Sequence, residues 1–232
     1  MRVNEFGQPI GSPVPDWQPC LWPPRTELVG NYCRLEPTHP NHTSELFTAF
    51  TQAHDANWTY MGYGPFRDLA TFTDWLSNTT QGNDPQFYTI FDDSKRAVGV
   101  ASYLRIEPKF GSIEVGHIHF SPRLQKKTAA TEAMYLMMQR AFDELGYRRY
   151  EWKCDALNAP SRRAAKRFGF TFEGVFRQHL MYKGRNRDTA WFSIVDSEWP
   201  PIKEAFQAWL DPANFDAEGK QRKPLLMPTN NK

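Results

Sequence analysis

The sequence predicts an α/β (α+β) fold in which helices cover both faces of a mixed sheet. The first observation behind this prediction is that apolar residues recur at helical spacing in some segments, while other segments are rich in β-forming residues. The second is the order of these segments: a strand, two helices, three strands, a helix, a strand, a helix, two strands and a closing helix. This order differs from the regular alternation of a nucleotide-binding fold and from an all-helical bundle.

The best helical pattern spans residues 128–145, where alanines, methionines and a leucine form one apolar stripe. Gly146 can end this helix because glycine readily adopts the left-handed conformation. Asn158 is a suitable N-cap for another helix, which Gly169 ends. Three further helices are expected at residues 43–52, at residues 68–77 and after the pair Pro200–Pro201.

The β-rich segments are short, and turn residues bound them. The charged turn at residues 92–96 indicates a hairpin between the second and third of these segments. The expected strands lie at residues 28–35, 86–91, 97–106, 112–120, 149–154, 172–182 and 189–195.

The chain divides into an arm, one domain and a tail. Residues 1–27 form an extended arm, because six of the eighteen prolines lie within the first 28 residues and exclude a helix or a central strand. Trp17 and Trp22 of the arm can dock on the domain. Residues 28–210 read as a single domain, and residues 211–232 as a C-terminal tail that lacks periodicity and is expected to fray.

Composition excludes several classes of protein. Hydrophobic residues make up 40% of the 232 residues and aromatic residues 15%, which excludes a disordered chain. No apolar run approaches the roughly 18 residues that a membrane span needs, and no secretory signal is visible. Cys20, Cys33 and Cys154 are far apart and form no CxxC motif, which argues against a disulfide scaffold or structural zinc. We therefore expect a soluble, cytoplasmic protein.

Charge is unevenly distributed along the chain. The net charge is only +2, but residues 121–188 hold 15 Lys and Arg against 7 Asp and Glu. Such a basic block suggests that this region meets an anion such as a phosphate-bearing ligand, although solvated helix faces would also account for it. Nucleic acid is not expected as a partner, because no continuous basic stripe with interleaved aromatic residues is present.

The segment between the strand at 112–120 and the helix at 128–145 is the best candidate for that anion site. A helix N-terminus presents free N–H groups, which favour phosphate. Thr128, Ala129 and Ala130 are small enough for a ligand to approach the backbone, and Lys126 and Lys127 add positive charge. An ordinary strand–helix connection is the alternative. The segment lacks GxxxxGK[ST] and GxGxxG, so neither a P-loop nor a dinucleotide fold is supported.

Taken together, four segments carry a resemblance to a known family. They are SIEVGHIHFSP, QKKTAATEA, RYEWKCDALN and NAPSRRAAKRFGF, the last followed by FEG. Their combination resembles the GNAT family of acetyl-CoA-dependent N-acetyltransferases over residues 28–195. It looks closest to the RimJ/RimL-type ribosomal-protein N-terminal acetyltransferases. The resemblance implies a mostly antiparallel central sheet with helices on both faces.

The resemblance also implies a binding site for acetyl-CoA. The family's loop Q/R-x-x-G-x-G/A matches Gln125, Thr128 and Ala130, with threonine in place of the first glycine, and its N-x-x-S element matches Asn158 and Ser161. A threonine there needs an ordinary φ and brings a methyl and a hydroxyl group near the pyrophosphate. The implied cofactor-binding residues are Phe120, Gln125, Lys126, Lys127, Thr128, Ala129, Ala130, Thr131, Asn158 and Ser161.

In this family the acceptor amine attacks the thioester directly, so the resemblance implies a base for the amine proton. Glu114 matches the acidic residue of the family's central strand. Strand alternation places it on one face with Gly116, Ile118 and Phe120, and apolar neighbours would raise its pKa. Glu173 is the second candidate, because it matches the glutamate proposed as base in the RimL-type enzymes. Each of the two carboxylates could instead pair with a nearby arginine.

The leaving thiolate needs a hydrogen-bond donor. Many members of the family carry a tyrosine seven residues after the asparagine, but that position is Ala165 here. We therefore expect Ser161, water or Tyr182 to assist the thiolate. The alternative for Ser161 is an ordinary role in the first turn of its helix.

The acceptor is expected to bind His54, Trp58, Tyr60 and Tyr182, although the aromatic residues could instead pack around the arm. A protein N-terminus, an amino acid, a polyamine and an aminoglycoside are all compatible with such a site. No metal is expected, despite the HxH pair His117 and His119.

The predicted function is transfer of the acetyl group of acetyl-CoA to a primary amine by a monomer or homodimer. A non-catalytic acyl-CoA-binding module on the same fold is the alternative. Neither hypothesis requires binding to a membrane or to a nucleic acid.

Overall fold

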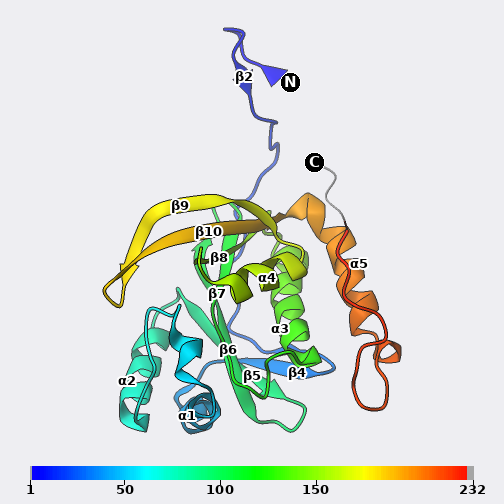
Figure 1. The fold of residues 1–232 in the computed structure, drawn as a ribbon. Helices are drawn as coiled ribbons and strands as arrows, with labels where there is room; N and C mark the ends of the chain where they lie inside the picture. Colours follow the sequence, from blue (N-terminus) through cyan, green and yellow to red (C-terminus); the bar gives the residue numbers. More distant parts are fainter. Residues whose placement is uncertain (1, 229–232) are drawn as a thin grey trace.

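The computed structural model describes residues 2–228, and an eight-stranded mixed sheet lies at its centre. The strands follow the order β3-β4-β5-β6-β7-β8-β10-β9, and every neighbouring pair is antiparallel except β7 and β8 (Figure 1). The predicted mixed, mostly antiparallel sheet is thus confirmed. The strands are β3 (Leu28–Val29), β4 (Cys33–Pro37), β5 (Gln86–Asp92), β6 (Ala97–Glu107), β7 (Ser112–Phe120), β8 (Arg149–Asp155), β9 (Thr171–Tyr182) and β10 (Arg185–Val195).

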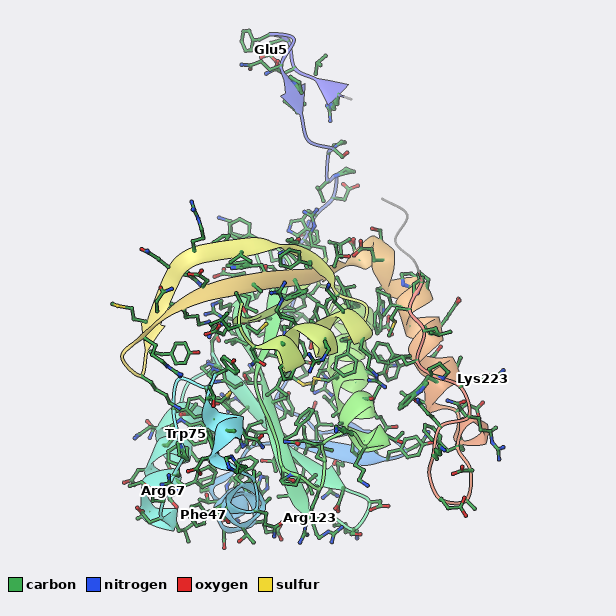
Figure 2. The ribbon with its side chains drawn as sticks, in the orientation of Figure 1. Glu5, Phe47, Arg67, Trp75, Arg123 and Lys223 are labelled. Atoms are coloured by element: carbon green, nitrogen blue, oxygen red, sulfur yellow. The ribbon has the colours of Figure 1, made fainter. Side chains whose placement is uncertain are left out.

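Helices cover both faces of the sheet, as the sequence predicts. On one face, α1 (Thr43–Thr51) and α2 (Leu69–Thr80) pack with β5 and β6, and Phe47 and Trp75 of these helices border that core (Figure 2). The opposite face packs against a larger core. Its helices are α3 (Thr128–Gln139), α4 (Ala159–Arg167) and α5 (Trp199–Leu210).

Three helix boundaries differ from the prediction by more than one residue. Helix α2 continues to Thr80 instead of ending at residue 77. The α-helical part of α3 ends at Gln139 and continues as one π-helical turn, Arg140–Glu144, before Gly146 turns the chain at φ +70°. In α5, both prolines lie inside the first turn instead of before the helix. This position is permitted because the first N–H groups of a helix have no helical partner for a proline to remove.

The segment at residues 28–35 forms two strands instead of the single strand expected. Glu132 of α3 stabilises the turn between them, and its side chain is 3% exposed. Its carboxylate accepts the backbone N–H groups of Asn31 (2.8 Å), Tyr32 (2.6 Å) and Cys33 (2.8 Å). A side chain at Gly30 would collide with this carboxylate, so the turn requires glycine there.

A β-bulge in β7 changes which face its side chains occupy. His117 has φ +50°, and the two residues His117 and Ile118 stand opposite one residue of β6. The alternation therefore shifts by one at this point. Glu114 faces the α1/α2 side, whereas Ile118 and Phe120 pack against the α3 core. The expectation that Glu114 shares a face with Ile118 and Phe120 is wrong for this reason.

The N-terminal arm projects from the body of the protein, with Glu5 near its tip (Figures 1 and 2). A two-stranded hairpin, β1 (Arg2–Val3) and β2 (Pro9–Ile10), lies at its far end. Trp17 docks on the domain, since its indole N–H donates to the carbonyl of Lys109 (2.9 Å). Trp22 remains 49% exposed.

The tail packs against α5 and the larger core as far as Met227, so within residues 211–228 it does not fray as expected; residues 229–232 lie outside the described chain. The Asn214 amide donates to the carbonyl of Trp209 (2.9 Å) and accepts the N–H of Lys223 (2.9 Å). Gln221 accepts the indole N–H of Trp209 (2.8 Å), and Leu225 is buried in the larger core.

We expect Glu132→Gln to lower the free energy of unfolding by about 1–3 kcal/mol. An amide keeps one acceptor oxygen where the carboxylate has two, so at least one buried N–H would face an NH₂ group. Urea unfolding followed by circular dichroism measures the change. Glu204→Gln on the exposed side of α5 is the matched control, with an expected change within about 0.5 kcal/mol. Equal stability of the two variants would contradict this account of the turn.

Candidate active site

A cleft of about 1370 Å³ opens where β7 and β8 separate. These parallel strands pair only over four residues each, from Ser112 to Val115 and from Arg149 to Trp152. Beyond that point the residues of both strands line the cleft. The volume exceeds the roughly 300–1,000 Å³ of a site for one small ligand, so it can hold two substrates.

One end of the cleft is the loop that leads into α3. Lys126 adopts φ +61°, and Lys127 is the extended N-cap residue. The N–H groups of Lys127 and Ala130 bond within the loop, whereas those of Lys126, Thr128 and Ala129 have no backbone acceptor within residues 2–228. Free N–H groups at a helix N-terminus, beside two lysines, form a cradle for an anion.

Nine of the ten predicted cofactor-binding residues line this cleft. The exception is Ala129, whose methyl group packs against the larger core while its N–H belongs to the cradle. Thr128 has an ordinary φ, because Lys126 takes the left-handed conformation of the loop. The Gln125 amide donates to the carbonyl of Phe120 (2.9 Å) and so holds the loop closed.

The start of α4 forms the facing wall. Asn158 caps this helix by accepting the N–H of Ser161 (3.1 Å), and both residues line the cleft. The Ser161 hydroxyl oxygen accepts the indole N–H of Trp152 (3.0 Å), and the hydroxyl also hydrogen-bonds with the side chain of Cys154. Burial raises the pKa of the neighbouring Cys154 thiol. Ala165 is fully buried in the core and does not reach the cleft.

Glu114 lies on β7 just before the strands separate. Its carboxylate is 3% exposed and forms ion pairs with Lys153 (2.8 Å) and Arg105 (2.8 Å). Burial raises its pKa above the ordinary value, and the two cations oppose that rise only in part. The raised pKa agrees with the prediction. The carboxylate has cationic partners instead of the apolar neighbours expected, and its pairing with Arg105 is the alternative that the sequence analysis left open.

The structure does not bring Glu173 to the cleft. Its carboxylate forms a two-point ion pair with Arg149 (2.8 and 2.6 Å) and accepts the hydroxyl of Ser193 (2.7 Å). The Arg149 guanidinium holds the pKa of Glu173 below its ordinary value. The hypothesis that Glu173 is the base is therefore withdrawn, because this carboxylate is outside the cleft and weakly basic.

Two of the four predicted acceptor residues have structural roles instead. His54 is exposed and caps the short helix Asp55–Trp58, where its ring accepts the N–H of Ala56 (3.1 Å). Trp58 is buried and stacks on His119, with ring centroids 3.8 Å apart. Neither side chain lines the cleft.

Of the other two, only Tyr60 lines the cleft. Tyr60 lines it and donates its hydroxyl to the carbonyl of Leu157 (3.1 Å), which joins the α1–α2 loop to the start of α4. Tyr182 lies behind the lining and donates its hydroxyl to Asp155 (2.6 Å). Burial and the Asp155 carboxylate raise the pKa of Tyr182 to about 12.

Several residues that line the cleft were not predicted from the sequence. Asp155, Lys153 and Arg187 come from β8 and β10, and only their position near strand ends could have singled them out. Residues of the tail also line the cleft, together with Arg167 of α4. The tail gave no signal, because its sequence has no periodicity. These tail residues are Phe215, Gly219, Lys220, Gln221, Pro224 and Leu225.

The two histidines of β7 lie beside the cleft as neutral groups. Burial lowers the pKa of both His117 and His119 to about 4. The Tyr63 hydroxyl lies 3.1 Å from Nδ1 of His117. Within residues 2–228 no group of three or more His, Cys, Asp or Glu side chains could hold a metal ion. The same residues include no helix that is long and apolar enough to cross a membrane.

Comparisons with known proteins agree with this geometry. A crystal structure of a GCN5-related N-acetyltransferase from Brucella melitensis is 48% identical, with a TM-score of 0.89 over 91% of this chain and 97% of that chain. The uncharacterized N-acetyltransferase p20 of Bacillus licheniformis is 26% identical over 60% of this chain and 80% of its own length. A Bacillus subtilis (strain 168) relative named YdaF is 24% identical over 71% of this chain and 90% of its own length; its name describes a ribosomal N-acetyltransferase whose activity is not established.

The family model described as "Acetyltransferase (GNAT) domain" matches residues 33–171, which contain the cradle, Glu114 and Ser161. The chain therefore belongs to the GNAT acetyltransferase family, whose members transfer an acetyl group from acetyl-CoA.

Proposed function

We propose that the protein is an N-acetyltransferase that moves the acetyl group of acetyl-CoA directly to a primary amine. The acceptor is the N-terminus of a protein or a small-molecule amine. The observation that carries this proposal is a single cleft with an anion cradle at one end and the buried carboxylate of Glu114 at the other. The cradle can hold the phosphates of acetyl-CoA and the carboxylate can accept the proton of an amine, so one cleft can bring both substrates together.

In this proposal the pyrophosphate of acetyl-CoA binds the free N–H groups of Lys126, Thr128 and Ala129. The pantetheine arm then lies between the parted strands β7 and β8, whose facing edges are free to bond an extended ligand. This arrangement brings the thioester toward Glu114 and Ser161, which both line the cleft.

The amine nitrogen attacks the thioester carbonyl carbon, and its proton passes to Glu114 directly or through one water. The carbon–sulfur bond then breaks, and the departing thiolate accepts a hydrogen bond from the O–H of Ser161, which turns toward it from the Cys154 sulfur. A direct attack suits this site, because the only cysteine in the cleft, among residues 2–228, is Cys154 with a raised pKa.

We also propose a place for the chain within its family and the cell. Similarity to YdaF supports the RimJ/RimL-type branch. Cys20, Cys33 and Cys154 are all free thiols, which suits the reducing cytoplasm. We retain residues 28–210 as the catalytic domain, with residues 1–27 as the arm and residues 211–232 as the tail.

Release of free thiol from acetyl-CoA in the presence of mixed primary amines tests the proposed function. We expect thiol release that depends on the amine, together with CoA binding by calorimetry. A non-catalytic module would bind CoA and release no thiol. Failure to bind CoA at micromolar to millimolar concentrations would contradict the proposal as a whole.

Thr128→Pro tests whether backbone N–H groups bind the pyrophosphate. Thr128 is the first residue of α3, where proline removes an N–H yet fits the helix. Losing one hydrogen bond to a charged group should weaken CoA binding about 10- to 100-fold. Thr128→Ala, which keeps the N–H, and Lys127→Ala should each weaken binding only a few-fold. Equal CoA affinities of Thr128→Pro and Thr128→Ala would rule out this cradle.

Glu114→Gln tests removal of the amine proton, and Ser161→Ala tests the hydrogen bond to the leaving thiolate. Loss of the base should lower kcat about 10²- to 10⁴-fold and abolish the fall in rate at acidic pH, because that fall reports protonation of Glu114. Loss of the Ser161 donor should lower kcat about 10- to 10³-fold and leave the acidic limb in place.

Steady-state kinetics across pH 6–9 and CoA calorimetry measure these effects, and CoA affinity should change little in Glu114→Gln. If the glutamine variant keeps its full rate and its acidic limb, Glu114 is not the base. If Ser161→Ala keeps its full rate, another group assists the thiolate, and Tyr182→Phe is the variant to measure next.

A further inference from the structure

Arg105 reaches the acceptor end of the cleft from a strained position. It has φ +47° in β6, at an irregularity in the pairing of β6 with β7. The Asp84 carboxylate accepts the N–H groups of both Arg105 (3.0 Å) and Ile106 (3.0 Å), which the irregularity leaves without strand partners. Left-handed backbone in a residue other than glycine persists only where its surroundings enforce it, and such residues concentrate at functional sites.

Arg187 reaches the same cleft from a second irregularity. The pairing of β10 with β9 shifts next to Arg187, where Gln178 has φ +50°. Here too an aspartate supplies the missing acceptor, since Asp188 accepts the N–H of Gln178 (2.7 Å). Bulges of this kind redirect side chains beside active sites. Two separate bulges, each pinned by an aspartate, thus place an arginine in one cleft.

Both guanidinium groups keep donors to spare. Arg105 is 49% exposed and donates to Glu114 through one nitrogen (2.8 Å), and Arg187 donates to Thr189 through Nε (3.0 Å). Their other nitrogens have no acceptor within residues 2–228. The second carboxylate of the cleft, Asp155, is already bonded to the N–H of Leu157 (2.8 Å) and to the Tyr182 hydroxyl.

Both arginines lower the pKa of the same histidine, His179. His179 of β9 bonds Thr189 (3.0 Å), so its ring lies next to the strand that carries Arg187. Its pKa is lowered, first by burial and then by repulsion from Arg187, Arg105 and Lys153. Cations from three strands therefore converge at the acceptor end; Lys153 is already paired with Glu114 (2.8 Å) and Glu151 (2.6 Å), which leaves Arg105 and Arg187 as the two with donors to spare.

We propose that Arg105 and Arg187 bind a carboxylate of the acceptor, so that the acceptor is an amine with a carboxylate a few bonds away. This inference rests on the proposed function and specifies its substrate class. A guanidinium presents paired donors that match the two oxygens of a carboxylate. With the carboxylate bound to the arginines, the amine lies beside Glu114, which receives its proton.

Two sources offer this chemistry, a free α-amino acid and a peptide whose first residue is acidic. The first is probed with L-methionine against L-methioninamide. The second is probed with the amide-capped peptides Asp-Ala-Ala and Asn-Ala-Ala. The amine of an amino-acid amide is less basic, so more of it is uncharged near neutral pH. A preference for L-methionine would therefore oppose the intrinsic order of reactivity.

For at least one source we expect kcat/KM to be about 10- to 100-fold higher for the carboxylate partner than for its neutral match. Arg187→Gln should remove this preference while CoA affinity stays within a few-fold. Arg177→Gln is the matched control, because Arg177 is exposed on β9 and does not line the cleft. Calorimetry of the CoA-saturated protein with the four probes supplies a readout that needs no turnover.

The inference is overturned if both neutral partners are used or bound as well as their carboxylate matches. It is also overturned if Arg187→Gln retains the preference, or if neither carboxylate amine binds. Acetylation of neutral amines by a protein that binds CoA would leave the proposed function standing while this inference fails. Absence of CoA binding and of thiol release with every amine would instead refute the proposed function.

Discussion

The early end of the β7–β8 pairing is the constraint on which the candidate site depends. Both strands remain strands after Val115 and Trp152 because each keeps its other neighbour: β6 continues along β7 to Phe120, and β10 continues along β8 to Asp155. Only the two facing edges lose their partners, and their N–H and C=O groups can bond an extended ligand. The connection between these two strands contains α3, so the cradle at the start of α3 necessarily lies at the open end.

Three of the seven non-glycine residues with positive φ among residues 2–228 lie around the same opening. Arg105, His117 and Lys126 all have positive φ without being glycine, and all three line the cleft. Local contacts hold each of them: Asp84 accepts two N–H groups at Arg105, the Tyr63 hydroxyl meets the ring of His117, and the Gln125 amide closes the loop at Lys126. Strain of this kind costs roughly 1–3 kcal/mol per residue, so the fold stabilises a cleft geometry that local preference alone would not give.

Local signals predicted the helices, most strands and the cradle, since the apolar stripe of α3 and the Asn158 cap depend on nearby residues alone. Most of the failures involve partners far away in the sequence. Glu132, about a hundred residues away, stabilises the turn that divides the first expected strand in two. Arg149 forms an ion pair with Glu173 outside the cleft. The bulge at His117 reverses the face of two residues in a strand whose boundaries were predicted correctly, because a single extra residue leaves no periodic signal. Without periodicity, the contacts of the tail could not be inferred either.

The pairing of Glu114 with two cations bears on how it could act as a base. Burial alone would favour the protonated carboxyl, which cannot accept a proton, whereas Lys153 and Arg105 favour the carboxylate. The net result is a raised pKa, which is closer to that of a useful base than the ordinary value. An acceptor carboxylate bound to Arg105 would weaken one of the two influences that lower this pKa. Glu114 would then be more basic with the acceptor bound, and the acidic limb of kcat would lie at higher pH than that of kcat/KM. If the acidic limb of kcat lay at lower pH than that of kcat/KM, Arg105 would not couple the acceptor to the base.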